Sequence, residues 1–157
     1  MSPERKILVR ALTAHPANLI HELAEELSAD FELKIINIPQ AGLGLLKLND
    51  GAFHEPYYLG EFPLSTCSVE ISLADGSRGV GGARVMEDDA ELAQALAILD
   101  AILANGFPGH AKITELIHKG MDKRNEEDRR RRMMLAATKV DFDLLNSAGK
   151  KENDDED

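Results

Sequence analysis

Apolar and polar residues alternate most regularly between residues 67 and 73. Apolar side chains occupy every second position there, so one face of a strand can be buried while the other faces water. Asp75 and Gly76 follow, and an Asp-Gly pair between two strand-like segments favours a hairpin turn because both residues tolerate a positive φ. A glycine-rich strand is predicted next, over residues 78–86. The pattern therefore predicts a strand–turn–strand unit.

The spacing of apolar residues becomes helical after this hairpin. A helix is expected to open at the acidic residues 87–89, and its apolar positions recur three or four residues apart. The stripe consists of Leu92, Ala95, Leu96, Leu99 and Leu103. A stripe of this kind can cover one face of the hairpin, so the rest of the chain is expected to pack around a strand–turn–strand–helix unit.

Two helices are predicted at the start of the chain. Residues 3–13 carry apolar side chains at helical spacing, and Pro3 suits the first turn of a helix. The pair His15-Pro16 ends this helix, because the residue before a proline is driven out of the helical region. A second helix is expected over residues 17–27.

Three short strands are predicted between these helices and the central unit. Residues 31–38 alternate, residues 39–42 interrupt the pattern with a proline and a glycine, and residues 43–48 form the second strand. A turn at residues 49–51 leads to a third strand over residues 53–59. Pro56 in that strand indicates an edge position or a bulge.

The C-terminal third is predicted to be helical. A short helix over residues 113–118 ends at Gly120, and Asp122 caps a longer helix over residues 123–138. The order of elements predicts an α+β fold: an antiparallel sheet of about four to five strands, with an N-terminal helix pair and C-terminal helices packed on it. We expect one domain, residues 1–149, and a disordered acidic tail, residues 150–157.

Composition narrows the possible functions. The chain has 157 residues, a formal net charge of −10, no Trp and 4% aromatic residues, which disfavours nucleic-acid binding. No apolar run reaches the length of about 18 residues needed to span a membrane. The N-terminus lacks a signal-peptide pattern. A single cysteine, Cys67, excludes an internal disulfide framework and multi-cysteine metal sites. These features predict a cytoplasmic protein that binds neither nucleic acid nor membrane.

No residue pattern assembles a recognisable active site. His21 and Glu22 resemble a zinc-protease motif, but position 25 is a glutamate where a second histidine is needed. The glycines at positions 76, 79, 81 and 82 invite a phosphate-loop interpretation. The helix after them begins with acidic residues that already occupy its positive end. A turn, a bulge or close approach of another backbone explains these glycines better, so no catalytic, cofactor or metal residues are predicted.

The possible roles of four further groups of residues are compared next. The four arginines of residues 129–132 follow acidic residues at helical spacing, which predicts a solvated helix face, or else a contact with an acidic partner or a triphosphate. Cys67 is expected to be a buried small hydrophobe. Asp100 lies among alanines and either bonds a nearby backbone or basic side chain or faces a partner. Glu61 has the same ambiguity.

The order and spacing of several segments resemble the PhnG family, the G subunits of the bacterial carbon–phosphorus lyase complex. The segments are Leu59-Gly60-Glu61, Asp75-Gly76, Ile98-Leu99-Asp100-Ala101 and the ending Ala137-Thr138-Lys139-Val140-Asp141-Phe142. The resemblance covers about residues 5–148. The chain departs from the family pattern at Met86-Glu87, where a glycine is common.

The resemblance implies an accessory subunit of a transferase that supports displacement of adenine from ATP by methylphosphonate. Expected partners are PhnH, PhnI and PhnJ, with PhnK and PhnL bound more loosely. ATP is then a substrate of the complex, and the iron–sulfur cluster and S-adenosylmethionine belong to another subunit. The chain itself is expected to bind no cofactor and to be non-catalytic.

The alternating C-terminal segment is the predicted partner interface, because such a segment can add a strand to another protein. Its residues are Val140, Phe142, Leu144 and Leu145, with Arg129 and Arg132 as polar contacts. Two alternatives stay open: a small autonomous ATP- or phosphate-binding enzyme that uses Glu61, Asp100 and the arginines, and a plain homodimeric adaptor. The isolated chain could also form homo-oligomers.

Overall fold

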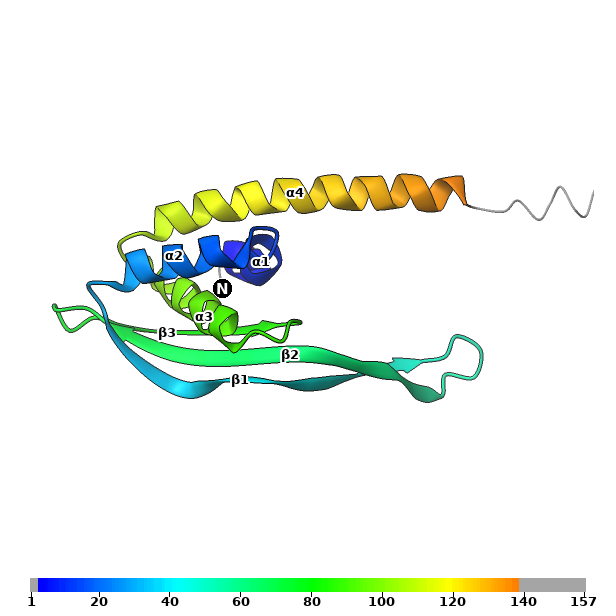
Figure 1. Ribbon diagram of the computed structural model, residues 1–157, viewed down its shortest axis with the longest axis horizontal. Helices are drawn as coiled ribbons and strands as arrows, with labels where there is room; N and C mark the ends of the chain where they lie inside the picture. Colours follow the sequence, from blue (N-terminus) through cyan, green and yellow to red (C-terminus); the bar gives the residue numbers. More distant parts are fainter. Residues whose placement is uncertain (1–2, 139–157) are drawn as a thin grey trace, which may run out of the picture. The chain divides into compact units, whose positions relative to one another are not determined.

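A computed structural model describes residues 3–138 of the chain. The elements in order are α1 (Pro3–Leu12), α2 (Ala17–Ser28), β1 (Glu32–Asn49), β2 (Pro56–Ser72), β3 (Arg78–Val85), α3 (Ala90–Asn105) and α4 (His110–Ala137). Figure 1 shows helices α1, α2 and α3 on one side of an antiparallel sheet with the order β1-β2-β3. The predicted α+β class is confirmed, but the described sheet has three strands rather than four or five.

The first strand is longer than predicted. β1 runs through residues 39–42, where a break was expected, and pairs with β2 from Glu32 to Asn49. The ladder shifts register on both sides of Asn37, so Pro39 lies in an irregular stretch of a strand at the sheet edge. A proline removes a donor that an edge strand does not need. The predicted break was wrong because a local sequence pattern does not show that Pro39 lies at the edge of the sheet.

The central strand joins two predicted strands into one. β2 contains both residues 56–59 and the alternating segment from Cys67 onward. Pro56 is its first residue, and Pro63 lies where β2 has β1 as its sole strand neighbour, because β3 pairs with residues 65–72. Both prolines thus occupy positions at which strands tolerate proline: the first residue of a strand, and a stretch with a strand neighbour on one side.

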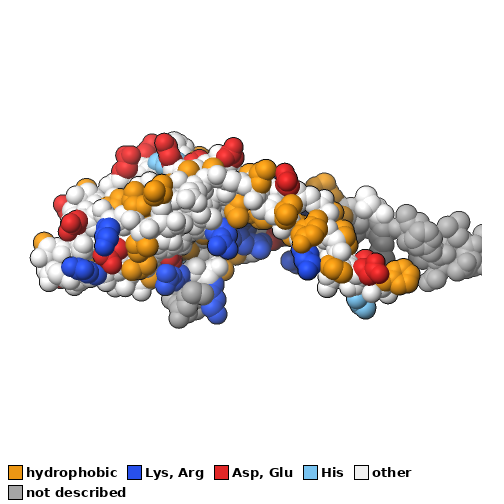
Figure 2. Space-filling model, turned by 90° about the horizontal axis from the view of Figure 1, so that it is seen from below, with side chains coloured by type: hydrophobic (Ala, Val, Ile, Leu, Met, Phe, Trp, Pro, Cys, Tyr) orange, Lys and Arg blue, Asp and Glu red, His pale blue; other side chains and the backbone are white. Residues whose placement is uncertain are grey.

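The β1–β2 hairpin continues beyond the end of β3 as a two-stranded ribbon, visible in Figure 1. We call residues 42–64 the arm. Asp50 holds the turn at its tip, because its carboxylate accepts hydrogen bonds from the backbone N–H of Ala52 at 2.6 Å and of Phe53 at 2.7 Å. Figure 2 views the sheet from the side turned away from the helices and shows hydrophobic side chains gathered over the arm.

The second hairpin forms as predicted from Asp75 and Gly76. The Asp75 carboxylate accepts a hydrogen bond from the Ser77 N–H at 2.8 Å, and Gly76 has a φ of 86°. The Leu73 N–H donates to the Ser77 carbonyl at 2.9 Å, which closes the turn. All of these signals are local, so the sequence alone was enough to predict them.

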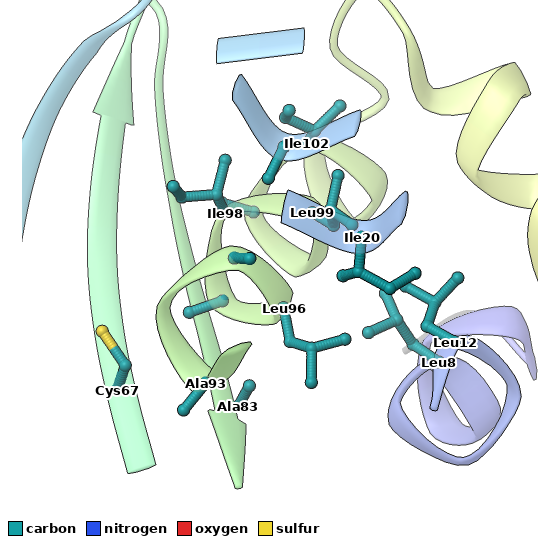
Figure 3. Packing of buried hydrophobic residues seen from close by; sticks show 14 of the residues in the cluster. Leu8, Leu12, Ile20, Cys67, Ala83, Ala93, Leu96, Ile98, Leu99 and Ile102 are labelled. Carbon is teal, nitrogen blue, oxygen red and sulfur yellow. The ribbon is translucent and has the colours of Figure 1, made fainter. Parts of the chain in front are cut away.

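Helix α3 forms the centre of the core. Asp89 caps it by accepting a hydrogen bond from the Leu92 N–H at 2.8 Å, and Gly106, with a φ of 64°, ends it in a left-handed cap. Residues 95–102, more than two consecutive turns, are all buried. Figure 3 shows Leu96, Ile98 and Leu99 of α3 among side chains from α1, α2 and the sheet. The predicted stripe is therefore too narrow, because this helix is covered on most of its circumference.

Helix α4 is continuous where two helices were predicted. Gly120 does not end a helix; a Cβ atom there would lie 2.1 Å from the Ala11 carbonyl oxygen of α1. The glycine permits two helix backbones to approach closely, and Asp122 lies within the helix rather than capping one. A ring nitrogen of His15, Nε2, also lies 3.0 Å from the Leu116 carbonyl oxygen. These contacts fix the first half of α4 against α1.

By its internal contacts the chain divides into two units, Met1–Lys123 and Arg124–Asp157. The first contains the sheet, α1, α2, α3 and the first half of α4. In the second, the described residues form the remainder of α4, to Ala137. The single domain over residues 1–149 and the acidic tail stay predictions, because residues 139–157 lie outside the described part.

Candidate functional site

Asp100 lies inside the fold and binds a basic side chain from the other end of the sequence. Its carboxylate oxygens accept hydrogen bonds from Arg5 Nε at 2.7 Å and Nη2 at 2.8 Å, and from the Gly82 N–H at 3.0 Å. The side chain of Asp100 is 7% exposed and that of Arg5 33%. Hydrogen bonding to Asp100 raises the pKa of Arg5 above its ordinary value, against the opposing effect of burial. Of the alternatives left open for Asp100, the structure shows the backbone and basic-side-chain contacts.

The glycine-rich strand β3 packs its backbone against α3. A Cβ at Gly81 would lie 2.2 Å from the Ala97 carbonyl oxygen and 2.3 Å from the Ala101 nitrogen. At Gly79 it would meet the side chains of Asn105 and Phe107. Of the alternatives left open for the glycines, close approach of another backbone is confirmed at Gly81 and a turn at Gly76. The N-terminus of α3 is already capped by Asp89.

Cys67 and Glu61 lie on the same strand in opposite environments. Cys67 is 1% exposed, its Sγ lies 3.5 Å from the Asn37 carbonyl oxygen, and burial raises the pKa of its thiol. The predicted role as a small hydrophobe is confirmed, because a thiol with a raised pKa is a weak nucleophile at neutral pH. Glu61 is exposed on the arm and pairs with Leu45 in the ladder.

The histidines are dispersed. His15, in the turn between α1 and α2, contacts α4 twice, with Nε2 at the Leu116 carbonyl and Nδ1 3.2 Å from Lys123 Nζ. Because a lysine ammonium can only donate, Nδ1 is the acceptor and Nε2 carries the proton that the carbonyl accepts. His21 borders a groove between α2, β1 and α3 with Glu25 and Glu91. Within residues 3–138 no group of three or more His, Cys, Asp or Glu side chains is placed to hold a metal ion.

The arginine run lies on the exposed second half of α4. Arg129 forms a bidentate pair with Glu126, at 2.9 and 3.0 Å, and Arg130 donates to the same carboxylate at 3.1 Å. Arg129 and Arg132 border a shallow open depression along one side of the helix, beside Asn125 and Met133. The helix carries its own counter-charges at three- and four-residue spacing, as predicted. The role of Arg129 and Arg132 as partner contacts stays a prediction.

Glu126 should titrate far below an ordinary glutamate. Hydrogen bonds from Arg129 and Arg130 lower its pKa from 4.5 to about 2. Since the carboxylate is more acidic in the helix than in the unfolded chain, its pairs stabilise this turn fully above pH 4.5, and the effect is lost as the pH falls through about 2. An NMR titration of the Glu126 side chain should give a midpoint near 2 at low salt.

The matched control for Glu126 is the double variant Arg129→Gln/Arg130→Gln, in which the midpoint should return towards 4.5. Salt at about 1 M should move it in the same direction, because these side chains are exposed and screening weakens exposed pairs. A midpoint at the ordinary glutamate value in the unmodified protein would contradict the pairing.

The remaining interface residues predicted from sequence, Val140, Phe142, Leu144 and Leu145, lie outside the described residues. Sequence reasoning missed a different surface, the arm. Its large apolar side chains are extensively exposed: Leu43 (69%), Leu45 (60%), Leu46 (41%), Phe53 (82%), Tyr57 (44%), Tyr58 (62%) and Leu59 (63%). The low charge of this stretch was the available signal: Lys47 and Glu61 are the charged residues of segments 42–49 and 56–64.

Among the described helices, no single one is long and apolar enough to cross a membrane. Helices α3 and α4 meet the length and composition criteria for a span as a pair, bent by 115° between them. The apolar member of this pair is α3, most of whose residues are buried in the core.

Comparison with known proteins identifies the family. A family model described as "Phosphonate metabolism protein PhnG" matches residues 3–146. The chain belongs to the PhnG family. A similar PhnG-family protein, from Rhizobium meliloti (strain 1021), is named "Alpha-D-ribose 1-methylphosphonate 5-triphosphate synthase subunit PhnG". The two are 30% identical over 112 residues, which are 71% of this chain and 68% of that protein. The PhnG resemblance seen in the sequence is therefore confirmed.

Proposed function

We propose that this PhnG-family chain is an accessory subunit of a phosphonate-processing enzyme complex and performs no chemistry itself. The complex transfers the ribose-triphosphate part of ATP to methylphosphonate and releases adenine. The name of the Rhizobium meliloti relative, a synthase subunit, supports this role. The observation that carries the proposal is that Asp100 and Cys67 both have structural roles. The buried acid is bound by Arg5 and Gly82, and the thiol is packed in the core.

The partners in this proposal are PhnH, PhnI and PhnJ, with PhnK and PhnL bound more loosely. PhnI supplies the step that displaces adenine, and PhnJ holds the iron–sulfur cluster and uses S-adenosylmethionine. ATP is a substrate of the assembly rather than a ligand of this chain. Such an assembly works in the cytoplasm, where ATP and reduced cofactors are available.

Co-expression tests the proposed role. The tagged chain is produced with PhnH, PhnI and PhnJ of the same organism, purified by its tag and sized by light scattering. A defined assembly containing the chain and the other subunits is expected. A chain that elutes alone in every preparation would overturn the proposal.

Calorimetry separates the accessory role from an autonomous ATP-binding enzyme. Titration of the isolated chain with ATP and Mg²⁺ should release no heat beyond dilution, whereas the assembled complex should bind ATP. Saturable ATP binding by the isolated chain would favour the enzyme instead, with the arginines of α4 as the first residues to test. Truncation after Thr138 tests the predicted C-terminal interface and should weaken assembly.

A further inference from the structure

The arm exposes apolar side chains on both of its faces. Residues opposite each other in a ladder share a face, so Leu43 with Pro63 and Leu45 with Glu61 continue the face on which Cys67 is buried under α3. These two leucines are 69% and 60% exposed, because α3, which covers the face at Cys67, does not extend over this part of the ribbon (Figure 1). The helix side of the arm is thus the continuation of a core face without its cover.

The other face of the arm differs from the other face of the sheet. Where β3 is present, the outer face of β2 carries polar residues, Ser68, Glu70 and Ser72. On the arm the same face carries Leu46, opposite Gly60, and Phe62, whose ring lies over Gly44. A sheet face turned to water keeps its polar alternation. The loss of that alternation beyond β3 indicates that a partner covers this face of the arm as well.

The arm also lacks the features that protect exposed strands. Its two strand segments carry two charged residues, Lys47 and Glu61, in a chain whose charged fraction is 29%. An exposed apolar ribbon with unpaired edges is a template for association unless charges protect it. Low charge together with aromatic and leucine side chains is the composition of the buried centre of a permanent interface.

The exposure of apolar side chains on both faces of the arm indicates what kind of partner binds it. A second copy of this chain, laid on the arm about a two-fold axis, would cover one face and leave the other in water. A cleft that receives the ribbon covers both faces. We propose that the arm inserts into an apolar cleft of a different subunit of the complex. This inference rests on the proposed accessory function and assigns its main contact to residues 42–64.

The test compares arm variants with a matched control in the co-expressed complex. The variant Leu43→Ser/Leu45→Ser alters one face, Leu46→Ser alters the other, and Leu19→Ser/Val80→Ser changes apolar residues that are 38% and 51% exposed outside the arm. The first variant should lose about 100-fold or more in affinity, since each leucine that becomes buried contributes roughly a tenfold factor. Leu46→Ser should lose about tenfold, and the control should assemble like wild type. Because the contact is apolar, assembly should persist in about 1 M NaCl.

Photo-crosslinking gives a second measurement that does not depend on a destabilising change. A photoreactive phenylalanine replaces Leu45, Leu46 or Val80 in turn, and the products are identified by mass spectrometry. Adducts from positions 45 and 46 with the same foreign subunit, and none from position 80, support insertion into a cleft. Adducts with a second copy of this chain, or from one face alone, would overturn it.

The two proposals fail in different ways. If wild type assembles with PhnH, PhnI and PhnJ but both arm variants assemble equally well, the accessory role stands and the arm inference is wrong. If wild type does not assemble with these subunits at all, both are wrong. If wild type forms a homodimer that the arm variants abolish, the occupant of the arm is a second copy and the arm inference is wrong.

Discussion

Replacing Gly81 by alanine is expected to lower the free energy of unfolding by about 3 kcal/mol. The added Cβ would lie 2.2 Å from the Ala97 carbonyl oxygen and 2.3 Å from the Ala101 nitrogen. Both are backbone atoms of α3 and cannot turn aside as a flexible side chain could, so strand and helix must separate along their length. Urea unfolding of the isolated chain, followed by far-ultraviolet circular dichroism, measures the loss.

Gly42→Ala is the matched control, since a Cβ at Gly42 meets nothing within 4 Å. It should change the free energy of unfolding by no more than about 0.5 kcal/mol. Equal midpoints for the Gly81 variant and wild type would mean that β3 and α3 do not pack at the distance described here.

Replacing Arg5 by alanine is expected to cost about 3 kcal/mol of stability. The change leaves the Asp100 carboxylate, 7% exposed, without the cation that binds both of its oxygens. Breaking a buried pair by removing one partner costs about 3–5 kcal/mol, and the lower end applies because Arg5 itself reaches water. Thermal and urea unfolding at neutral pH measure the effect.

Two further variants show that the cost comes from an uncompensated charge. Arg5→Met/Asp100→Leu removes both charges and should be more stable than Arg5→Ala, because no buried carboxylate is left unpaired. Arg130→Ala removes an exposed pair with Glu126 and should cost much less stability than Arg5→Ala. Similar losses for Arg5→Ala and Arg130→Ala would contradict the importance of burial.

Signals confined to a few neighbouring residues were enough to predict several elements. The turn at Asp75 and Gly76 and the start of α3 next to the acidic residues 87–89 both depend on hydrogen bonds within a few residues. The breaks expected at residues 39–42 and at Gly120 were wrong for the opposite reason. A proline and a glycine end elements in isolation, but here the sheet edge accepts Pro39 and the backbone of α1 requires Gly120.

The same distinction applies to the candidate site. Asp100 could be singled out from sequence because an acid among alanines is unusual, but its partner lies 95 residues away and no local pattern points to Arg5. The sequence predicted separate short strands over residues 43–48 and 53–59, and no local pattern shows that they continue past the rest of the sheet. Its exposure depends on where β3 ends, at Val85 opposite Ser65, and that is a property of the assembled sheet.

The pairing of Arg5 with Asp100 also sets an order of events during synthesis. Arg5 leaves the ribosome 95 residues before Asp100, and the contact between His15 and Leu116 spans 101 residues. At a translation rate of about 5–20 residues per second, α1 waits roughly 5–20 s for α3. During that interval its apolar face, with Leu8 and Leu12, is without the cover that α3 provides. The first helix to be made is therefore among the last to be fully buried.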